Sequence, residues 1–424
     1  MGYFSNHKTL QHKYQQTRQY FEQICAPLNI EDYNLQAMPE TSPAKWHLAH
    51  TNWFFETFLL KPYCTGYRVW NQHFEFLFNS YYNAIGPQFT RPKRGLLSRP
   101  GVEEVYAYRR HVDEYMMQLL SQIDHKDRSR IEERTLLGIN HEQQHQELFF
   151  TDLKYSLFQN PMYPSYEPNH QQAANAEPQT LFWSEFQATE TVIGMSASGK
   201  TDNNRFCYDN ETPSHSVLLA PFKLANRLIT NVEYLEFIND GGYQRPELWL
   251  ADGWNEIQSQ NLTKPLYWLN QSGDWFEYGL GGLQPLNPLQ PISHVSAYES
   301  DAYAKWAGAR LPTEYEWEHA ANLSKPADAK IKSTFTPNAA NDSDRLEQFH
   351  DHLWQWTSSA YHPYPGFKTA EGAIGEYNGK FMCNQLVLRG SSCVTPPAHS
   401  RNSYRNFFYP KDRWQFTGIR LAKS

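Results

Sequence analysis

The sequence changes character near residue 160, and this change limits the folds open to the chain. Before that point, apolar residues recur at helical spacing over four long segments, at about 8–24, 43–60, 101–123 and 128–153. Beyond about residue 180 this spacing fades, and short strand-like runs alternate with Gly, Pro and Asn turns. The order predicts an α + mixed α/β fold, with a four-helix bundle followed by a mixed α/β domain of little regular secondary structure.

The boundary between the two domains is expected in a stretch rich in Pro, Asn, Gln and Ala. We place the helical bundle at residues 1–165, a linker at 166–180 and the second domain at 181–424. Within the bundle, the connection at 61–100 is too long for a simple turn, so it is a candidate functional loop.

Charge and cysteine content exclude several classes of function. The net charge of -7 provides no basic surface for nucleic acid or an anionic membrane. No apolar run approaches the roughly 18 residues that span a bilayer, and the N-terminus lacks a signal-peptide pattern. The five cysteines are widely spaced without a CxxC pair, so no disulfide framework is expected. These features predict a cytoplasmic protein that binds neither nucleic acid nor a membrane, and they leave the oligomeric state open.

Two histidines lie four residues apart in the fourth helical segment. His141 and His145 share one face of a helix and can direct two imidazoles at one point, as in many transition-metal sites. A third imidazole could come from His47 or His50, which are three apart and cannot both point squarely at one centre. Glu147 lies about 200° round the helix from His145, so we expect it to support a ligand rather than bind metal itself.

Three interpretations of these histidines compete. The run His141-Glu142-Gln143-Gln144-His145 also fits the H-E-x-x-H pattern of zinc hydrolases, in which Glu142 would be the general base, but nothing downstream identifies a third ligand. The histidines could also be solvent-facing residues on a polar helix face. Three neutral imidazoles on an octahedral ion leave three positions open, enough for two substrates and O₂. Because zinc has no redox chemistry, such a centre favours Fe(II).

Longer motifs resemble a known family of two-domain enzymes. The run from Ser42 to His50 and the run at 141–147 resemble the DinB-like bundle of the ergothioneine-pathway sulfoxide synthases (EgtB). The second domain resembles the formylglycine-generating enzymes, which have a C-type-lectin-like fold, through motifs at 291–296, 302–318, 354–357, 388–392 and 418–422. Formylglycine-generating enzymes use a cysteine pair near the C-terminus. Only Cys393 lies in that region here, so that activity is not expected.

The resemblance implies an oxygenase that contains iron(II) and acts on hercynine, which is Nα-trimethylhistidine. The family uses O₂ to join a thiol sulfur to the hercynine imidazole and makes a sulfoxide. Carried over to this sequence, the iron ligands are His50, His141 and His145, and the hercynine carboxylate is bound by Gln144 and Asn406. Two amides suit a buried carboxylate because they donate hydrogen bonds without adding a charge.

The residues after Asn406 distinguish the thiol substrates within the family. The type that uses γ-glutamylcysteine has Trp-Asp at this point, whereas this sequence has Phe407 and Phe408. The missing carboxylate removes a partner for the substrate ammonium group, which favours free cysteine. In the 61–100 loop, Tyr81 and Tyr82 resemble the paired tyrosines of the cysteine-using subtype and are predicted proton donors. The alternative is that one or both are core aromatics.

Two arginines in the same loop are predicted to bind the thiol substrate. Arg91 and Arg94 match the family pair that holds its carboxylate, for which a planar guanidinium is well suited. The alternative is a solvated basic turn. A further family arginine corresponds to Asp412 here, and Arg413 could take its place.

The sequence thus predicts an enzyme that converts hercynine, cysteine and O₂ to hercynylcysteine sulfoxide. Close alternatives are the same reaction with γ-glutamylcysteine, an ovothiol-type pairing of histidine with cysteine, and a selenium-sugar substrate. A zinc hydrolase and a non-catalytic binding module are the more distant ones.

Overall fold

A computed structural model of the chain describes residues 2–122, 126–167, 180–196, 206–324, 335–341 and 345–424. It divides into two compact units. The first comprises Met1–Met162 and Ala370–Tyr377, and the second comprises Tyr163–Thr369 and Asn378–Ser424. Most of the expected linker at 166–180 lies outside the described residues. The short segment Ala370–Tyr377 therefore belongs with the bundle, although the chain around it belongs with the second unit.

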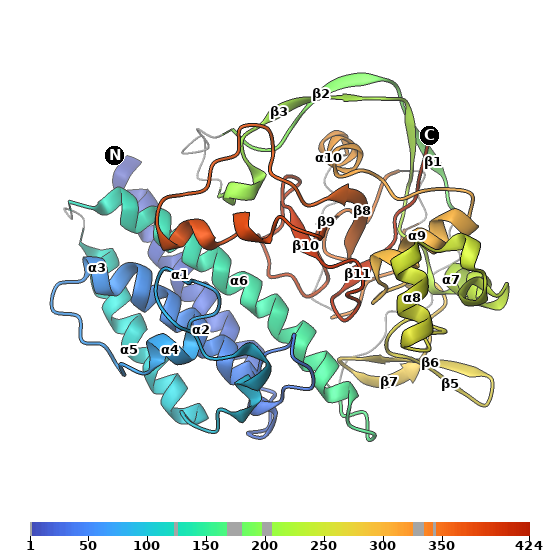
Figure 1. Cartoon of the computed structure of the whole chain (residues 1–424). Helices are drawn as coiled ribbons and strands as arrows, with labels where there is room; N and C mark the ends of the chain where they lie inside the picture. Colours follow the sequence, from blue (N-terminus) through green and yellow to red (C-terminus); the bar gives the residue numbers. More distant parts are fainter. Residues whose placement is uncertain (1, 123–125, 168–179, 197–205, 325–334, 342–344) are drawn as a thin grey trace. The chain divides into compact units, whose positions relative to one another are not determined.

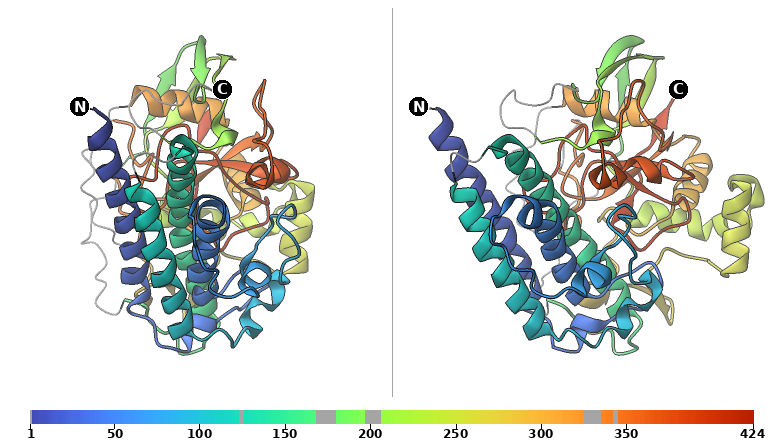
Figure 2. Two further views of the ribbon diagram at one scale, coloured as in Figure 1. Left: turned by 90° about the vertical axis from the view of Figure 1, so that its left-hand side faces the viewer. Right: turned by 60° about the vertical axis from the view of Figure 1, so that its left-hand side comes forward.

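The first unit is the expected bundle (Figure 1). Its long helices are α1 (Gly2–Cys25), α2 (Ala44–Phe55), α5 (Val102–Ser121) and α6 (Arg128–Phe158). Helix α2 packs against α5 and α6, and α1 packs against α6. Figure 2 shows α1, α5 and α6 running side by side. The connection between α2 and α5 holds a π-helical turn (Glu56–Leu60), α3 (Lys61–Tyr63), α4 (Phe74–Phe78) and a 3-10 helix (Arg91–Leu96).

Helix α2 is buried along its whole length, which is unusual for a helix with polar residues. Every residue from Ala44 to Phe55 is buried, including His47, His50 and Asn52. A helix that is covered on all sides normally carries only apolar side chains. Its polar groups therefore need partners inside the protein, and those partners form much of the site described below.

The second unit contains short strands in small sheets, as the sequence predicts. One sheet has the order β10-β9-β8-β11 and joins Asn406–Phe408, Leu386–Arg389, Trp354–Ala360 and Thr417–Gly418. A second has the order β1-β4-β12, from Trp183–Phe186, Phe222–Ala225 and Ala422–Lys423. The remaining strands form the pair β2-β3 (Thr189–Ile193 and His215–Leu219) and the sheet β5-β6-β7 (Trp268–Gln271, Asp274–Gly279 and Gly282–Pro285).

The second unit also has four helices, of which α9 and α10 pack against strands, and a buried charge cluster joins α10 to two of the strand segments. The helices are α7 (Asn231–Asn239), α8 (Ala251–Ser259), α9 (Ala297–Trp306) and α10 (Glu314–Leu323). At the start of α10, Glu314 Oε2 accepts hydrogen bonds from Arg389 Nη2 and Arg405 Nε, both at 2.9 Å. Because Arg405 directly precedes β10, this cluster fixes the point where that strand begins.

Two expectations drawn from the composition concern cysteines and membrane spans. No disulfide joins the five cysteines, all of which lie in described parts of the chain. Among the helices that the structure describes, none is both long enough and apolar enough to cross a membrane.

Candidate metal centre

Three imidazoles meet inside the first unit. Helix α2 contributes His50, and α6 contributes His141 and His145 from successive turns. Their ring centroids lie 4.6 to 4.9 Å apart, and one nitrogen from each ring lies within 4.8 Å of the other two. All three side chains are buried. The sequence prediction required His50 on α2 to approach His141 and His145 on α6. The structure brings these three residues together.

The surroundings of His50 orient its ring toward the other two. Its Nδ1 lies 2.6 Å from the carbonyl oxygen of Phe78. A carbonyl oxygen only accepts, so Nδ1 carries the proton and Nε2 carries the lone pair. That Nε2 lies 3.1 Å from Nε2 of His141.

Burial keeps these imidazoles neutral. It lowers the pKa of His141 to about 3, with a smaller contribution from His47. It also lowers the pKa of His50 and of His145 well below the usual value, and neighbouring imidazoles add to the effect. Neutral imidazole is the form that binds a metal ion. Three neutral nitrogen donors fit Fe, Zn, Cu or Ni, so the donor set alone does not select the ion.

A continuous stack of planar groups holds His50 in place. The Trp46 indole stacks on the His50 ring at 4.6 Å and 12°, and Trp53 stacks on it at 5.4 Å and 14°. The guanidinium carbon of Arg94 lies 3.4 Å from the centre of the Trp46 ring, within cation–π range. The predicted thiol-binding loop is thus connected to a predicted metal ligand through one indole.

Arg94 is the buried member of the predicted arginine pair. It donates to the hydroxyl oxygens of Ser42 (2.9 Å) and Ser80 (3.3 Å), both neutral, and its Nε has no partner among the described residues. Burial, together with the positive charge of Arg91, lowers its pKa. Asp152 acts on this pKa in the opposite direction but does not share a hydrogen bond with Arg94. A buried guanidinium without a hydrogen-bonded carboxylate indicates a place for an anion. Arg91 is exposed and donates to the carbonyl oxygen of Glu40.

The predicted tyrosine pair has one core member. Tyr81 and Tyr82 stack on each other with centroids 4.6 Å apart. Tyr82 is fully buried and packs against Trp53 (5.5 Å) and Phe58 (5.1 Å). Tyr81 is only half-buried. Tyr82 therefore contributes to the core behind His50, and Tyr81 is the more accessible phenol of the two.

A third tyrosine, absent from the sequence prediction, lies beside the histidines. The Tyr377 hydroxyl donates to Oε1 of Gln144, and its ring centroid lies 5.7 Å from that of His141. The preceding residue, Glu376, accepts hydrogen bonds from the backbone N–H groups of Asn83 (3.1 Å) and Ala84 (2.8 Å). Two consecutive residues thus contact the ligand helix and the loop that follows Tyr82. No local pattern signals this, because Tyr377 is 233 residues from Gln144.

The hydrogen bonds of Glu142 remove the zinc-hydrolase alternative. Its carboxylate is fully buried, 2.7 Å from Arg18 Nη1 and 2.6 Å from Arg109 Nη2. Burial would raise its pKa, but the two arginines lower it further than burial raises it. A carboxylate held by two guanidinium groups is not available as a general base. The Glu142 side chain therefore belongs to the structural interior of the bundle.

Helix α6 also carries the predicted supporting residue. Glu147 is half-buried, and its backbone carbonyl accepts a hydrogen bond from the Thr151 hydroxyl. The supporting role of Glu147 stays a prediction. His47, which the sequence offered as a possible ligand, contacts His145, and its Nδ1 lies 2.9 Å from Nδ1 of His145.

The predicted residues of the second unit form a mainly aromatic surface. Asn406 is half-buried at the start of β10, and its Oδ1 accepts from the Phe407 N–H at 2.9 Å. Phe407 stacks on Tyr361 with centroids 4.1 Å apart. Phe408 meets Trp414 edge-on at 5.9 Å.

Arg413 is engaged elsewhere in the second unit. Its Nη1 lies 3.0 Å from Oε1 of Glu299, and its Nη2 donates to the carbonyl oxygen of Lys264 at 3.0 Å. The ion pair with Glu299 already neutralises the charge that substrate binding would use.

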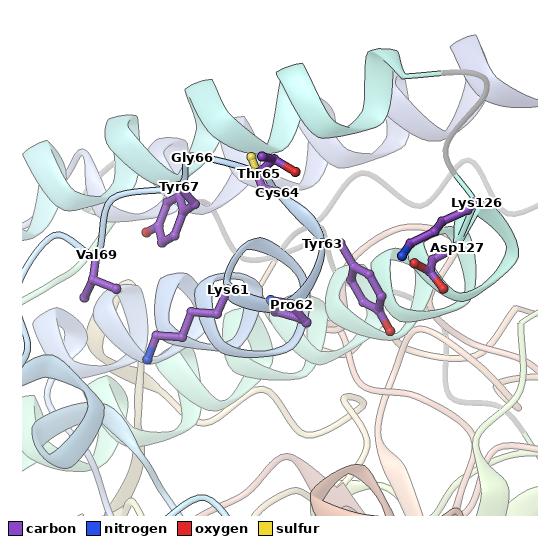
Figure 3. Close-up of a pocket in the computed structure, with 10 residues that line it drawn as sticks. All are labelled: Lys61, Pro62, Tyr63, Cys64, Thr65, Gly66, Tyr67, Val69, Lys126 and Asp127. Atoms are coloured by element: carbon purple, nitrogen blue, oxygen red, sulfur yellow. The ribbon is translucent and has the colours of Figure 1, made fainter.

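A separate hollow lies on the first unit. Its volume is about 510 Å³, and it is lined by residues 61–67, Val69, Lys126 and Asp127 (Figure 3). None of the predicted site residues lines it.

The two parts of the chain match two family models. The DinB superfamily model matches residues 13–149, and the model described as "Sulfatase-modifying factor enzyme 1-like domain" matches 185–352 and 335–424. The three histidines thus lie within the DinB match. Fold and site together define a two-domain protein with a candidate metal centre in its helical bundle.

Known relatives share part of their length with this chain. Hercynine oxygenase of Mycolicibacterium smegmatis is 35% identical over 240 residues, which cover 50% of this chain and 55% of the relative. Hercynine oxygenase of Mycobacterium tuberculosis is 35% identical over 255 residues, covering 54% and 58%. Ergothioneine biosynthesis protein 1 of Schizosaccharomyces pombe is 28% identical over 244 residues, covering 54% and 29%.

The chain therefore spans little more than half the length of the hercynine oxygenases that it matches. It belongs to the sulfatase-modifying factor family, whose model matches more than half of the chain, and it has a DinB superfamily domain before that match. The resemblance drawn from its motifs is confirmed.

Proposed function

We propose that this protein is an Fe(II)- and O₂-dependent sulfoxide synthase that joins hercynine to cysteine. The product is hercynylcysteine sulfoxide, a step of ergothioneine biosynthesis. The observation that carries this proposal is the buried cluster of His50, His141 and His145 in a chain whose relatives include hercynine oxygenases. O₂ alone balances the reaction. The hydrogens of one C–H and one S–H bond leave as water with one oxygen atom, and the other oxygen atom becomes the sulfoxide.

The donor set fits iron in this role. Three neutral imidazoles leave coordination positions open on an octahedral ion, whereas zinc cannot supply electrons to O₂. Iron held by these histidines would supply the redox chemistry that couples O₂ reduction to formation of the C–S and S–O bonds. The buried, aromatic surroundings of His50 would limit the access of water to that chemistry.

Hercynine needs a donor for its carboxylate and room for its trimethylammonium group. Gln144 lies between the two ligand positions on α6, and the contact from Tyr377 fixes its amide by engaging the carbonyl oxygen. The amide N–H₂ group is then directed away from Tyr377 and can donate to a carboxylate. The Asn406 contact remains a prediction from the family resemblance.

Cysteine fits the residues predicted to bind the thiol substrate. The buried guanidinium of Arg94 donates hydrogen bonds to two hydroxyl groups and to no carboxylate, so the carboxylate of cysteine would give it a direct ion pair. Phe407 and Phe408 offer no carboxylate for the ammonium group of a γ-glutamyl residue, which supports the smaller substrate. Arg91 is exposed, so it would contribute mainly to the approach of the anion.

A phenol beside the centre is a candidate proton donor. The ring of Tyr377 lies against His141, and its hydroxyl would deliver its one proton by turning it from Oε1 of Gln144 to the reacting oxygen. Tyr81 and Tyr82 remain the pair predicted from the sequence, with Tyr81 the more accessible.

The test combines metal analysis with O₂ consumption. The anaerobically loaded Fe(II) protein should consume O₂ with hercynine plus cysteine and form the sulfoxide, identified by mass spectrometry. Reactions without hercynine, with γ-glutamylcysteine, and with the His50→Ala variant are the controls. If the Fe(II)-loaded protein forms no C–S product with cysteine or γ-glutamylcysteine and no C–Se product with a selenium sugar, the proposal is wrong. A preference for one of the other two donors would correct the thiol substrate alone.

A further inference from the structure

Behind the metal centre, a carboxylate and a histidine form a hydrogen-bonded series that ends on one predicted metal ligand. His47 Nδ1 lies 2.9 Å from His145 Nδ1, and His47 Nε2 lies 3.1 Å from Asp152 Oδ2. The same Oδ2 accepts a hydrogen bond from the backbone N–H of Ser42 at 2.8 Å. His47 comes from α2 and Asp152 from α6, two turns beyond His145.

The positions of the protons in this hydrogen-bonded series follow from Asp152, the residue farthest from the metal centre. Asp152 as a carboxylate can only accept, so His47 must donate to it from Nε2. A neutral His47 then has its lone pair on Nδ1 and can only accept there, so His145 donates from its own Nδ1. The lone pair of His145 is left on Nε2, the nitrogen available to a metal ion. The Asp152 carboxylate thereby fixes the tautomers of both imidazoles.

Burial makes this order strict. His47 and Asp152 are only 2% and 3% exposed, so water cannot readily replace either partner. If His145 carried its proton on Nε2, two lone pairs would face each other at 2.9 Å inside the protein. Two buried acceptors without a proton between them would each lose a hydrogen bond, which disfavours that tautomer.

We propose that His47 and Asp152 are positioning residues that hold His145 with its Nε2 lone pair directed into the metal centre. This inference rests on the proposed metal centre and adds two residues to it, neither of them a ligand. The partner comes from the neighbouring helix α2, at a position that the sequence offered only as a possible ligand. Carboxylate-linked histidines of this kind also increase the basicity of the ligand nitrogen, and losing them typically costs about 10–100-fold in metal affinity.

The test uses binding of Co(II) alone to the full-length apoprotein, followed by visible absorption and chelator competition. His47→Phe removes the acceptor and should raise the dissociation constant about 10–100-fold. His47→Asn keeps an oxygen near the Nδ1 position and should recover part of this loss. Asp152→Asn can keep an oxygen toward both Ser42 and His47 but removes the charge, so its loss should be smaller, about tenfold.

The matched control is His111→Phe. His111 lies on α5 in the same unit and bonds to the carbonyl oxygen of Arg68 at 2.7 Å. It should bind Co(II) with wild-type affinity.

Two results separate this inference from the function on which it rests. If the wild-type protein does not bind Co(II), the metal centre itself is refuted. If the wild-type protein binds but His47→Phe and Asp152→Asn bind equally well, only the positioning role is refuted. Should His47→Phe fail to fold, Asp152→Asn and His47→Asn decide the question, and wild-type affinity in both would overturn it.

Discussion

Replacing Glu142 with Gln tests whether the H-E-x-x-H run has a structural or a catalytic glutamate. The carboxylate is fully buried and accepts charge-assisted hydrogen bonds from Arg18 (2.7 Å) and Arg109 (2.6 Å). Breaking a buried ion pair from one side typically costs about 3–5 kcal/mol, because the remaining charge loses its partner. Arg18 retains Asp113 at 2.7 Å and Arg109 retains Glu22 at 3.3 Å, so the lower end applies. We expect a loss of about 3 kcal/mol, roughly a 100-fold change in the unfolding equilibrium.

The assay is chemical denaturation followed by circular dichroism, where the helices of the bundle dominate the signal. The control is Glu22→Gln, which removes a 46% exposed carboxylate from the same Arg109 and should change stability by at most about 1 kcal/mol. A general base would behave in the opposite way, since Glu142→Gln would then abolish hydrolysis and leave the fold intact. A variant as stable as the wild type would therefore refute the structural role.

Four further predictions follow from the contacts described above. Arg94→Lys should raise the KM for cysteine about 10–100-fold because the planar guanidinium is lost. The KM for cysteamine, which has no carboxylate, should be nearly the same for the variant and the wild type. Tyr377→Phe should shift the product from sulfoxide toward cysteine sulfinate in mass spectrometry. If Tyr377→Phe keeps the wild-type ratio of sulfoxide to sulfinate and Tyr81→Phe changes it, Tyr81 is the proton donor and not Tyr377. Glu376→Ala should release the backbone at Asn83 and Ala84 and speed limited proteolysis there, and cleavage at the wild-type rate would contradict that anchoring role. Glu314→Gln should destabilise the second unit by about 3–5 kcal/mol in thermal denaturation, since two buried arginines share that carboxylate, and an unchanged transition would show that the cluster does not need its charge.

Local spacing explains why part of the centre could be predicted from the sequence. His141 and His145 are one helical turn apart, so their convergence needs only the helix itself. The DinB-like motif that ends at His50 supplied the third position through the family resemblance. The two-domain order was visible because the period of the apolar residues changes between the halves of the chain.

The remaining contacts depend on tertiary structure, which the spacing of residues along the sequence does not predict. Glu376 and Tyr377 reach the bundle from a segment more than 200 residues beyond α6. The contact between His145 and His47 could not be read from spacing, because His47 lies on the neighbouring helix α2. The sequence also did not predict which way the Glu142 side chain points, because its two arginine partners lie on α1 and α5.

The contacts of the histidines imply that the centre is formed before a metal ion binds. His50 is held by a carbonyl oxygen and by two indoles, and His145 is held by His47. For His141 the orientation rests on packing, because its ring stacks on Phe54 at 4.5 Å and its Nδ1 has no hydrogen-bond partner among the described residues.

Removing the metal should therefore leave the fold unchanged, unlike in small domains that fold only around their ion. Circular dichroism of the chelator-treated protein should match that of the loaded protein. Added Co(II) should raise the free energy of unfolding only by mass action, by about 2.7 kcal/mol at 100 times the dissociation constant. A bundle that loses its helices with the chelator would show instead that the histidines need the ion to come together. The preorganisation inferred from His50 and His145 would then be wrong.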